Sequence, residues 1–168
     1  MKAIKLILSL ALGISAVFAQ AQNYVAVAKD GNVYDEANAK YITLNQNNDE
    51  VSVIPGMVFA TSEHTPGWYK IEYSPGLHAF IPDQITASNF NEIKPGNYDV
   101  KNNSGQKLVA EGSGENWTAS VNGTTYKGVK WEDILVFLDN NNNIAFSLVD
   151  LGDGPVAISY DNAVTKFF

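Results

Sequence analysis

The feature that most constrains this chain is a succession of short apolar segments separated by strong turn signals. Pro-Gly pairs occur at 55–56, 66–67, 75–76 and 95–96, and an Asn-Gly pair occurs at 122–123. Pro presets φ for the start of a turn and Gly accepts a positive φ, so each pair ends one extended segment and begins another. Helical periodicity is hard to find beyond the N-terminal segment. The sequence therefore predicts an all-β chain.

A change of composition at residues 83–93 separates two groups of expected strands. The first group predicts a small barrel, and the short connections of the second predict an antiparallel meander or barrel. The expected strands are residues 24–27, 41–44, 51–53, 57–61, 68–73 and 78–81, then 97–101, 107–111, 117–121, 124–130, 134–138, 144–149 and 156–160. We therefore expect two modules, residues 22–87 and residues 88–168.

The second module contains one unusually apolar hairpin. Residues 134–138 and 144–149 are almost continuously apolar, which is typical of strands covered on both faces. The polar segments 139–143 and 150–154 on either side of the second strand are expected to be hairpin tips. The terminal pair Phe167-Phe168 is expected to close a core or cover a strand edge.

Residues 1–21 are typical of a secretory signal peptide. Lys2 and Lys5 precede an apolar stretch at 6–18, which is shorter than the roughly 20 residues of a membrane-spanning helix. Small residues suit cleavage after Ala19 or Ala21. A buried N-terminal helix is the alternative. We expect an exported protein, periplasmic or extracellular, without a membrane span.

Composition excludes several classes of partner and chemistry. The formal net charge is −7, and every basic residue is Lys. Nucleic acids and anionic membrane surfaces favour dense positive charge, so neither is an expected partner. The chain has no Cys, which rules out disulfides, thiolate nucleophiles and thiolate metal sites.

Four short segments of the first module follow the motif order of a known family. They are Gly-Asn-Val-Tyr at 31–34, Val-Ile-Pro-Gly-Met-Val-Phe at 53–59, Gly-Trp-Tyr-Lys-Ile at 67–71 and Gly-Leu-His-Ala-Phe-Ile at 76–81. On these segments, residues 24–87 resemble the bacterial SH3 (SH3b) domain family. Tyr34, Ala79 and Phe80 stand where that family usually has Arg, Gly and Trp. The resemblance implies an SH3-like small barrel that binds cell-wall peptides or proteins and is not a catalyst. It does not extend to residues 88–168.

Alternation within the Gly-Trp segment indicates a recognition surface. In residues 68–73, Trp68, Lys70 and Glu72 fall on one face, and the apolar residues between them fall on the face that must be buried. A partly exposed Trp beside charged side chains is typical of binding surfaces. The candidate ligand-binding residues are Tyr34, Asp35, Glu36, Trp68 and His78. The two acids would favour cationic groups such as peptide amines.

Catalytic constellations are not evident. The two histidines, His64 and His78, both lie in the first module, so the second module cannot contain a Ser-His or Cys-His site. His64 is expected on the surface, in a loop before Pro66, and His78 is expected to pack or to make a hydrogen bond at the rim of the surface. The acidic pairs at 35–36, 49–50 and 132–133 point to opposite faces of an extended chain and do not form facing carboxylates. We therefore expect no enzymatic activity.

Metal and cofactor sites are also not expected. Asp139 and the four asparagines after it resemble the start of a calcium loop, but Ile144 stands where such a loop needs Gly, and Asp150 stands where it needs Glu. This segment and residues 150–154 are better interpreted as turns. Trp117 and Trp131 flank the apolar hairpin and are expected to be core residues.

Two interpretations of function remain open, with a third far weaker. The first is an exported non-catalytic binding protein whose partner is a cell-wall peptide or envelope protein. The alternative is a secreted inhibitor or protein-interaction factor that acts through hairpin tips of the second module. A hydrolase would rest on acidic residues alone. The sequence leaves the ligand and the oligomeric state open.

Overall fold

The computed structural model describes residues 23–38, 50–101 and 105–160. Within these ranges the protein is all-β, as predicted, with one 3-10 turn, η1 (Asp83–Ile85). The expected signal peptide, the expected strand at 41–44 and the Phe167-Phe168 pair lie outside the described residues. No helix in the described ranges is both long enough and apolar enough to span a membrane.

The first module is built on a four-stranded antiparallel sheet with the order β1-β4-β5-β6. These strands are β1 (Asn23–Ala26), β4 (Val58–Thr65), β5 (Trp68–Ser74) and β6 (Leu77–Pro82), and a separate pair is formed by β2 (Gly31–Asn32) and β3 (Ser52–Val53). After β6 the chain makes the η1 turn, and Thr86 then bridges Val27 beside β1. The sheet therefore curls around an apolar interior that includes Val33, Phe59 and Ile71.

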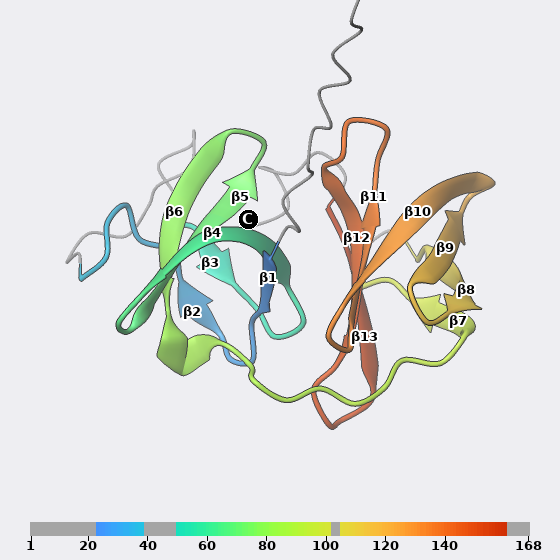
Figure 1. The fold of residues 1–168 in the computed structure, drawn as a ribbon, viewed down its shortest axis with the longest axis horizontal. Coiled ribbons are helices and arrows are strands. Elements are labelled where there is room, and N and C mark those ends of the chain that lie inside the picture. Colours follow the sequence, from blue (N-terminus) through green and yellow to red (C-terminus); the bar gives the residue numbers. More distant parts are fainter. Residues whose placement is uncertain (1–22, 39–49, 102–104, 161–168) are drawn as a thin grey trace, which may run out of the picture.

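The second module is a seven-stranded antiparallel meander in which each strand pairs with the next along the chain. Its strands are β7 (Gly96–Asp99), β8 (Lys107–Ser113), β9 (Asn116–Val121), β10 (Thr124–Trp131), β11 (Ile134–Leu138), β12 (Ile144–Asp150) and β13 (Pro155–Ser159). A parallel bridge between Val100 and Ala157 joins the two ends into a nearly closed barrel (Figure 1). The predicted meander is confirmed.

Turn chemistry fixes the register of this meander. Asn122 and Gly123 have φ values of 50° and 81° between β9 and β10, as a two-residue type I′ hairpin requires. At the tip between β11 and β12, the Asp139 carboxylate accepts hydrogen bonds from the backbone N–H groups of Asn141 and Asn143, both at 2.8 Å. Both expected hairpins are present.

The apolar hairpin is covered on both faces, as its sequence predicts. One face, with Phe137, Phe146 and Leu148, fills the barrel. The other packs against the four-stranded sheet through a cluster of buried residues from both sheets, namely Tyr24, Ala26, Val58, Ile134, Val136 and Val149. The first module is therefore the cover that this pattern requires.

The last strand also reaches the interior of the first module. Ile158 and Tyr160 belong to the apolar cluster that contains Phe59. The Tyr160 hydroxyl accepts a hydrogen bond from the backbone N–H of Val58 at 2.5 Å and shares another with Ser147 at 3.1 Å. Burial raises the pKa of Tyr160 to about 12. The two sheets thus share both an apolar interface and a buried polar contact.

Candidate functional site

Trp68 begins β5 and lies partly exposed on the surface of the four-stranded sheet. Its indole Nε1 donates a hydrogen bond to the Asn38 side-chain oxygen at 3.0 Å. Its ring meets the Tyr34 ring edge-to-face, with centroids 5.2 Å apart and planes at 86°, an arrangement worth about 0.5–1.5 kcal/mol beyond area burial. The indole therefore has a fixed orientation with part of its surface in water.

Tyr34 is positioned by backbone pairing with β6. Its N–H donates to the Phe80 carbonyl at 2.8 Å, and the Phe80 N–H donates to the Tyr34 carbonyl at 2.7 Å. Lys70 pairs with Phe80 and Trp68 with Pro82 across β5 and β6, so these side chains share one side of the sheet. We call this set, Tyr34, Trp68, Lys70, Phe80 and Pro82, the aromatic face.

The opposite side of β5 and β6 is the module interior. Ile71, Ala79 and Ile81 are fully buried there, and Tyr69 and Tyr73 pack against the same cluster. The alternation predicted for residues 68–73 is confirmed, because the strand presents one side to the core and the other to the surface.

His78 lies on the same side of β6 as Phe80 and is exposed. Its cross-strand partner is Glu72, whose carboxylate accepts a hydrogen bond from the Gly76 N–H at 2.6 Å. His78 therefore lies next to the aromatic face, beyond Phe80 and away from Trp68. It is not part of the Tyr34–Trp68 pair.

Asp35 and Glu36 are exposed and follow Tyr34 in a bend. Burial raises the pKa of Tyr73, and the negative charge of Asp35 raises it further. Asp35 thus acts electrostatically on Tyr73, which belongs to the other side of β5. Of the five predicted site residues, the structure brings Tyr34 and Trp68 into direct contact.

His64 differs from its prediction. It lies in β4 rather than in a loop, because β4 extends through a bulge between Thr61 and Glu63 as far as Thr65. Its ring stacks on Tyr69 with centroids 4.1 Å apart, and its Nε2 lies 3.0 Å from an oxygen of Asp83. The predicted surface position is correct, but the residue lies in a strand, because β4 continues past residue 61 up to the predicted turn at Pro66-Gly67.

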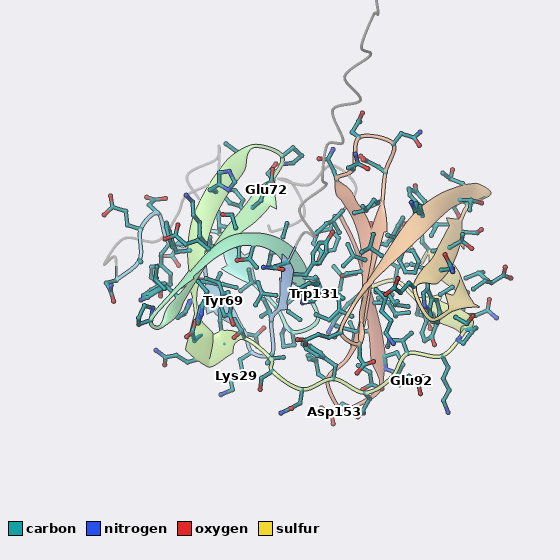
Figure 2. All side chains as sticks on the ribbon, viewed as in Figure 1. Lys29, Tyr69, Glu72, Glu92, Trp131 and Asp153 are labelled. Carbon is teal, nitrogen blue, oxygen red and sulfur yellow. The ribbon has the colours of Figure 1, made fainter. Side chains whose placement is uncertain are left out.

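The two expected core tryptophans both pack inward. Trp117 is 6% exposed within the barrel cluster. Trp131 is partly buried between the two sheets (Figure 2), where it lines a cavity of about 440 Å³ together with His64, Tyr69 and Phe90. In the described ranges, no group of three or more His, Asp or Glu side chains could hold a metal ion.

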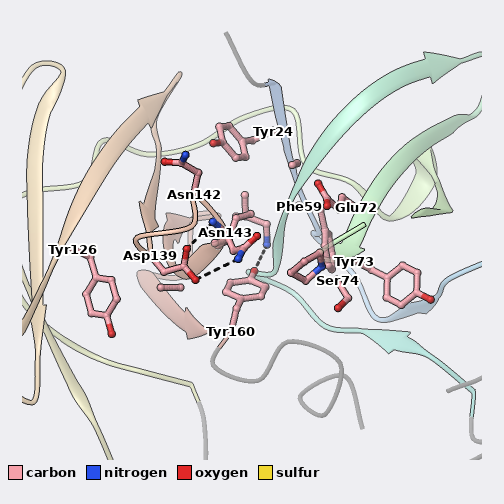
Figure 3. Close-up of a pocket in the computed structure, with 15 residues that line it drawn as sticks. Tyr24, Phe59, Glu72, Tyr73, Ser74, Tyr126, Asp139, Asn142, Asn143 and Tyr160 are labelled. Carbon is pink, nitrogen blue, oxygen red and sulfur yellow. Dashed lines mark hydrogen bonds between the residues drawn. The ribbon is translucent and has the colours of Figure 1, made fainter. Parts of the chain in front are cut away.

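A second cavity of about 450 Å³ opens between the sheets beside β5, and the sequence gives no direct indication of it. We call it the junction pocket (Figure 3). Its walls come from both sheets and are formed by Tyr24, Val58, Phe59, Ala60, Glu72, Tyr73, Ser74, Pro75, Tyr126, Asp139, Asn142, Asn143, Ile144, Ala145 and Tyr160. The apolar hairpin at 134–149 was the sequence signal that could have indicated this pocket, because it showed that another part of the chain must cover the hairpin. It did not show which strands form that cover.

No family model, curated protein or solved structure matches this chain. The candidate site therefore rests on the geometry of its own residues. Two places concentrate aromatic side chains at or near the surface, namely the aromatic face on β5 and β6 and the junction pocket between the sheets.

Proposed function

We propose that this protein is an exported, non-catalytic binding protein that recognises a cell-wall peptide or an envelope protein through the aromatic face. The observation that carries the proposal is the edge-to-face pair of Tyr34 and Trp68, which is partly exposed on the outer side of the four-stranded sheet. Export rests on the character of residues 1–21, and the ligand class rests on the resemblance to SH3b domains.

The preorganisation of the aromatic pair supports a binding role. Asn38 holds the indole nitrogen, and two backbone hydrogen bonds to Phe80 hold Tyr34. Side chains that are already ordered lose little conformational entropy when a ligand arrives, so their contacts contribute more fully to affinity. Lys70 adds a positive charge between the apolar groups of this face.

The path of the chain after β6 supports the proposed family. The resemblance implies a short turn and strand at residues 82–86, and here η1 is followed by the bridge between Thr86 and Val27. The interior position of Ile71 and Ile81 suits a small barrel core, and it leaves Trp68 and Phe80 for the surface.

The test is the affinity of the protein for soluble peptidoglycan fragments, measured by isothermal titration. Trp68→Ala is expected to weaken binding at least tenfold, because a preorganised aromatic at the centre of a contact is a typical hot spot. The matched control is Leu77→Ala, which removes an apolar side chain that is 46% exposed at the β5–β6 turn, off the aromatic face. Circular dichroism must show that both variants fold.

Absence of affinity in the unmodified protein for both peptidoglycan fragments and envelope proteins would refute the proposal. So would equal affinity losses in Trp68→Ala and Leu77→Ala.

A secreted inhibitor or protein-interaction factor acting through the second module is the alternative function. The observation in its favour is the tip between β11 and β12, which projects from the barrel (Figure 1) and is held rigid by the Asp139 carboxylate. A pull-down from envelope extract that returns one stoichiometric protein, and loses it on replacement of Asn140–Asn142 by Gly-Ser-Gly, would favour this alternative.

A further inference from the structure

The junction pocket is large enough for a small ligand or one long side chain. Its volume of about 450 Å³ falls within the usual range for small-molecule sites, roughly 300–1,000 Å³. It lies on a different part of the four-stranded sheet from the Tyr34–Trp68 pair, so the inference below does not depend on the proposed function.

The pocket exists because the barrel covers only part of the four-stranded sheet. Tyr24 pairs with Ala60, and Ala60 pairs with Glu72, which forms one row across β1, β4 and β5. The barrel packs on the β1 and β4 part of this sheet through Ile134, Val136 and Val149. The cover ends before β5, and the space left beside Glu72 is closed on the other side by the β11–β12 tip.

Aromatic rings form much of the wall. Tyr24, Tyr126 and Tyr160 come from three different segments. The hydroxyl of Tyr160 is already bonded to Val58 and Ser147, and the Tyr126 ring rests edge-to-face on Phe146 with centroids 5.2 Å apart. The face of an aromatic ring carries negative potential, which attracts cations.

The charges of the wall have a single sign. Glu72 contributes a carboxylate from the four-stranded sheet and Asp139 contributes one from the barrel side (Figure 3). None of the lining residues, all of which belong to the described ranges, is a Lys or a His. A backbone N–H donor fixes each carboxylate, Gly76 for Glu72 and both Asn141 and Asn143 for Asp139.

Acids on two sheets, aromatic rings and the absence of Lys and His from the lining residues disfavour an anionic ligand and favour a cation with an apolar stem.

We propose that the junction pocket binds an alkylammonium group, with the ammonium between Glu72 and Asp139 and the stem against the tyrosine rings. The group could belong to a lysine-like side chain of a peptide or to a free diamine. Both present the same chemistry to the pocket.

The experiment is an isothermal calorimetric titration of the purified full-length protein with three probes. These are N-acetyl-lysine amide, 1,5-diaminopentane and the neutral N-acetyl-norleucine amide. At least one amine is expected to bind with a dissociation constant tenfold or more below that of the neutral probe. A lower constant for the lysine probe assigns the group to a peptide, and a lower constant for the diamine assigns it to a free amine.

Glu72→Gln is the decisive variant, because it removes the charge but keeps an oxygen for the Gly76 N–H. It is expected to weaken amine binding at least fivefold. Glu115→Gln, an equally conservative change at an exposed residue of the β8–β9 turn, is expected to leave binding unchanged.

Three results would overturn the assignment. The first is the absence of saturable amine binding, and the second is equal affinity for the norleucine probe. The third is equal behaviour of Glu72→Gln and Glu115→Gln in a protein whose circular dichroism is unchanged. Because none of these variants touches Trp68, failure here is distinguishable from failure of the aromatic face to bind peptidoglycan fragments.

Discussion

The two sheets of this protein differ in how they complete their interiors. The seven-stranded sheet nearly closes on itself, and Leu108, Phe137 and Leu148 are buried among its own strands. The four-stranded sheet does not close in this way, and its core includes Ile158 and Tyr160 from the other module. The difference shows that the first module depends on the second for part of its core.

The same difference separates structural aromatics from candidate functional ones. In the barrel, Trp117 is buried and its Nε1 donates to the Gly114 carbonyl at 3.0 Å. In the first module, Trp68 stays partly in water with Asn38 as its partner. The seven-stranded sheet buries Trp117 in its own interior, whereas the four-stranded sheet leaves Trp68 partly in solvent.

The largest effect is expected from separating the two modules. A fragment of residues 22–87 lacks Ile158 and Tyr160, and a fragment of residues 88–168 exposes Ile134, Val136 and Val149 to water. The fragment of residues 22–87 alone is expected to give a poorly dispersed amide NMR spectrum, and addition of the fragment of residues 88–168 should restore dispersion. A well-dispersed spectrum for residues 22–87 alone would show that the first core does not need the last strand.

Alkaline pH is expected to weaken the contact between the sheets. The pKa of Tyr160 is about 12 in the folded protein and about 10 when unfolded, so between these values the unfolded state loses its proton first. Stability from this group is complete below pH 10 and declines by about 3 kcal/mol as pH rises through 12. Urea unfolding at several pH values measures it.

Tyr160→Phe is the matching control for the pH experiment. It is expected to cost about 1–3 kcal/mol at pH 7, because the buried Val58 N–H loses its acceptor. Its stability should then decline less steeply than that of the unmodified protein above pH 10. Parallel declines would mean that the other tyrosines with raised pKa, such as Tyr24 and Tyr73, account for the effect.

A smaller effect should distinguish two glycines with the same backbone conformation. Gly56 and Gly67 have φ values of 91° and 90°, but a Cβ on Gly56 would lie 2.8 Å from Val156 Cγ1, whereas one on Gly67 would meet nothing within 4 Å. Both Gly→Ala changes cost about 1–2 kcal/mol of backbone strain. Gly56→Ala is expected to cost about 1–3 kcal/mol more, because it overpacks the contact with β13.

Thermal unfolding of both glycine variants measures that difference. Adding Val156→Ala should recover much of the excess in Gly56→Ala and none in Gly67→Ala. Equal costs for the two glycines would contradict a tight contact between the sheets.

Local features of this fold were predictable from the sequence. Each expected strand in the described ranges is present, because alternation and turn residues act over a few positions. Asn122-Gly123 forced a hairpin, and the alternation of 68–73 placed Trp68 outside and Ile71 inside. The all-β class and the meander followed from these signals.

The features that depend on distant contacts were not predictable. Val58 and Tyr160 are 102 residues apart, and no periodicity connects them. The apolar hairpin at 134–149 showed that another element must pack on it, yet nothing in the sequence around Tyr24 or Val58 indicates that these residues do so. The junction pocket arises from this packing, so the sequence predicted the partly exposed aromatic residues Tyr34 and Trp68 but gave no direct sign of the pocket.

The position of Tyr160 in the core of the first module affects the order in which the chain can fold during synthesis. Val58 leaves the ribosome 102 residues before the hydroxyl that will accept its N–H. The core of the first module is therefore expected to be complete only after Ile158 and Tyr160 have emerged from the ribosome.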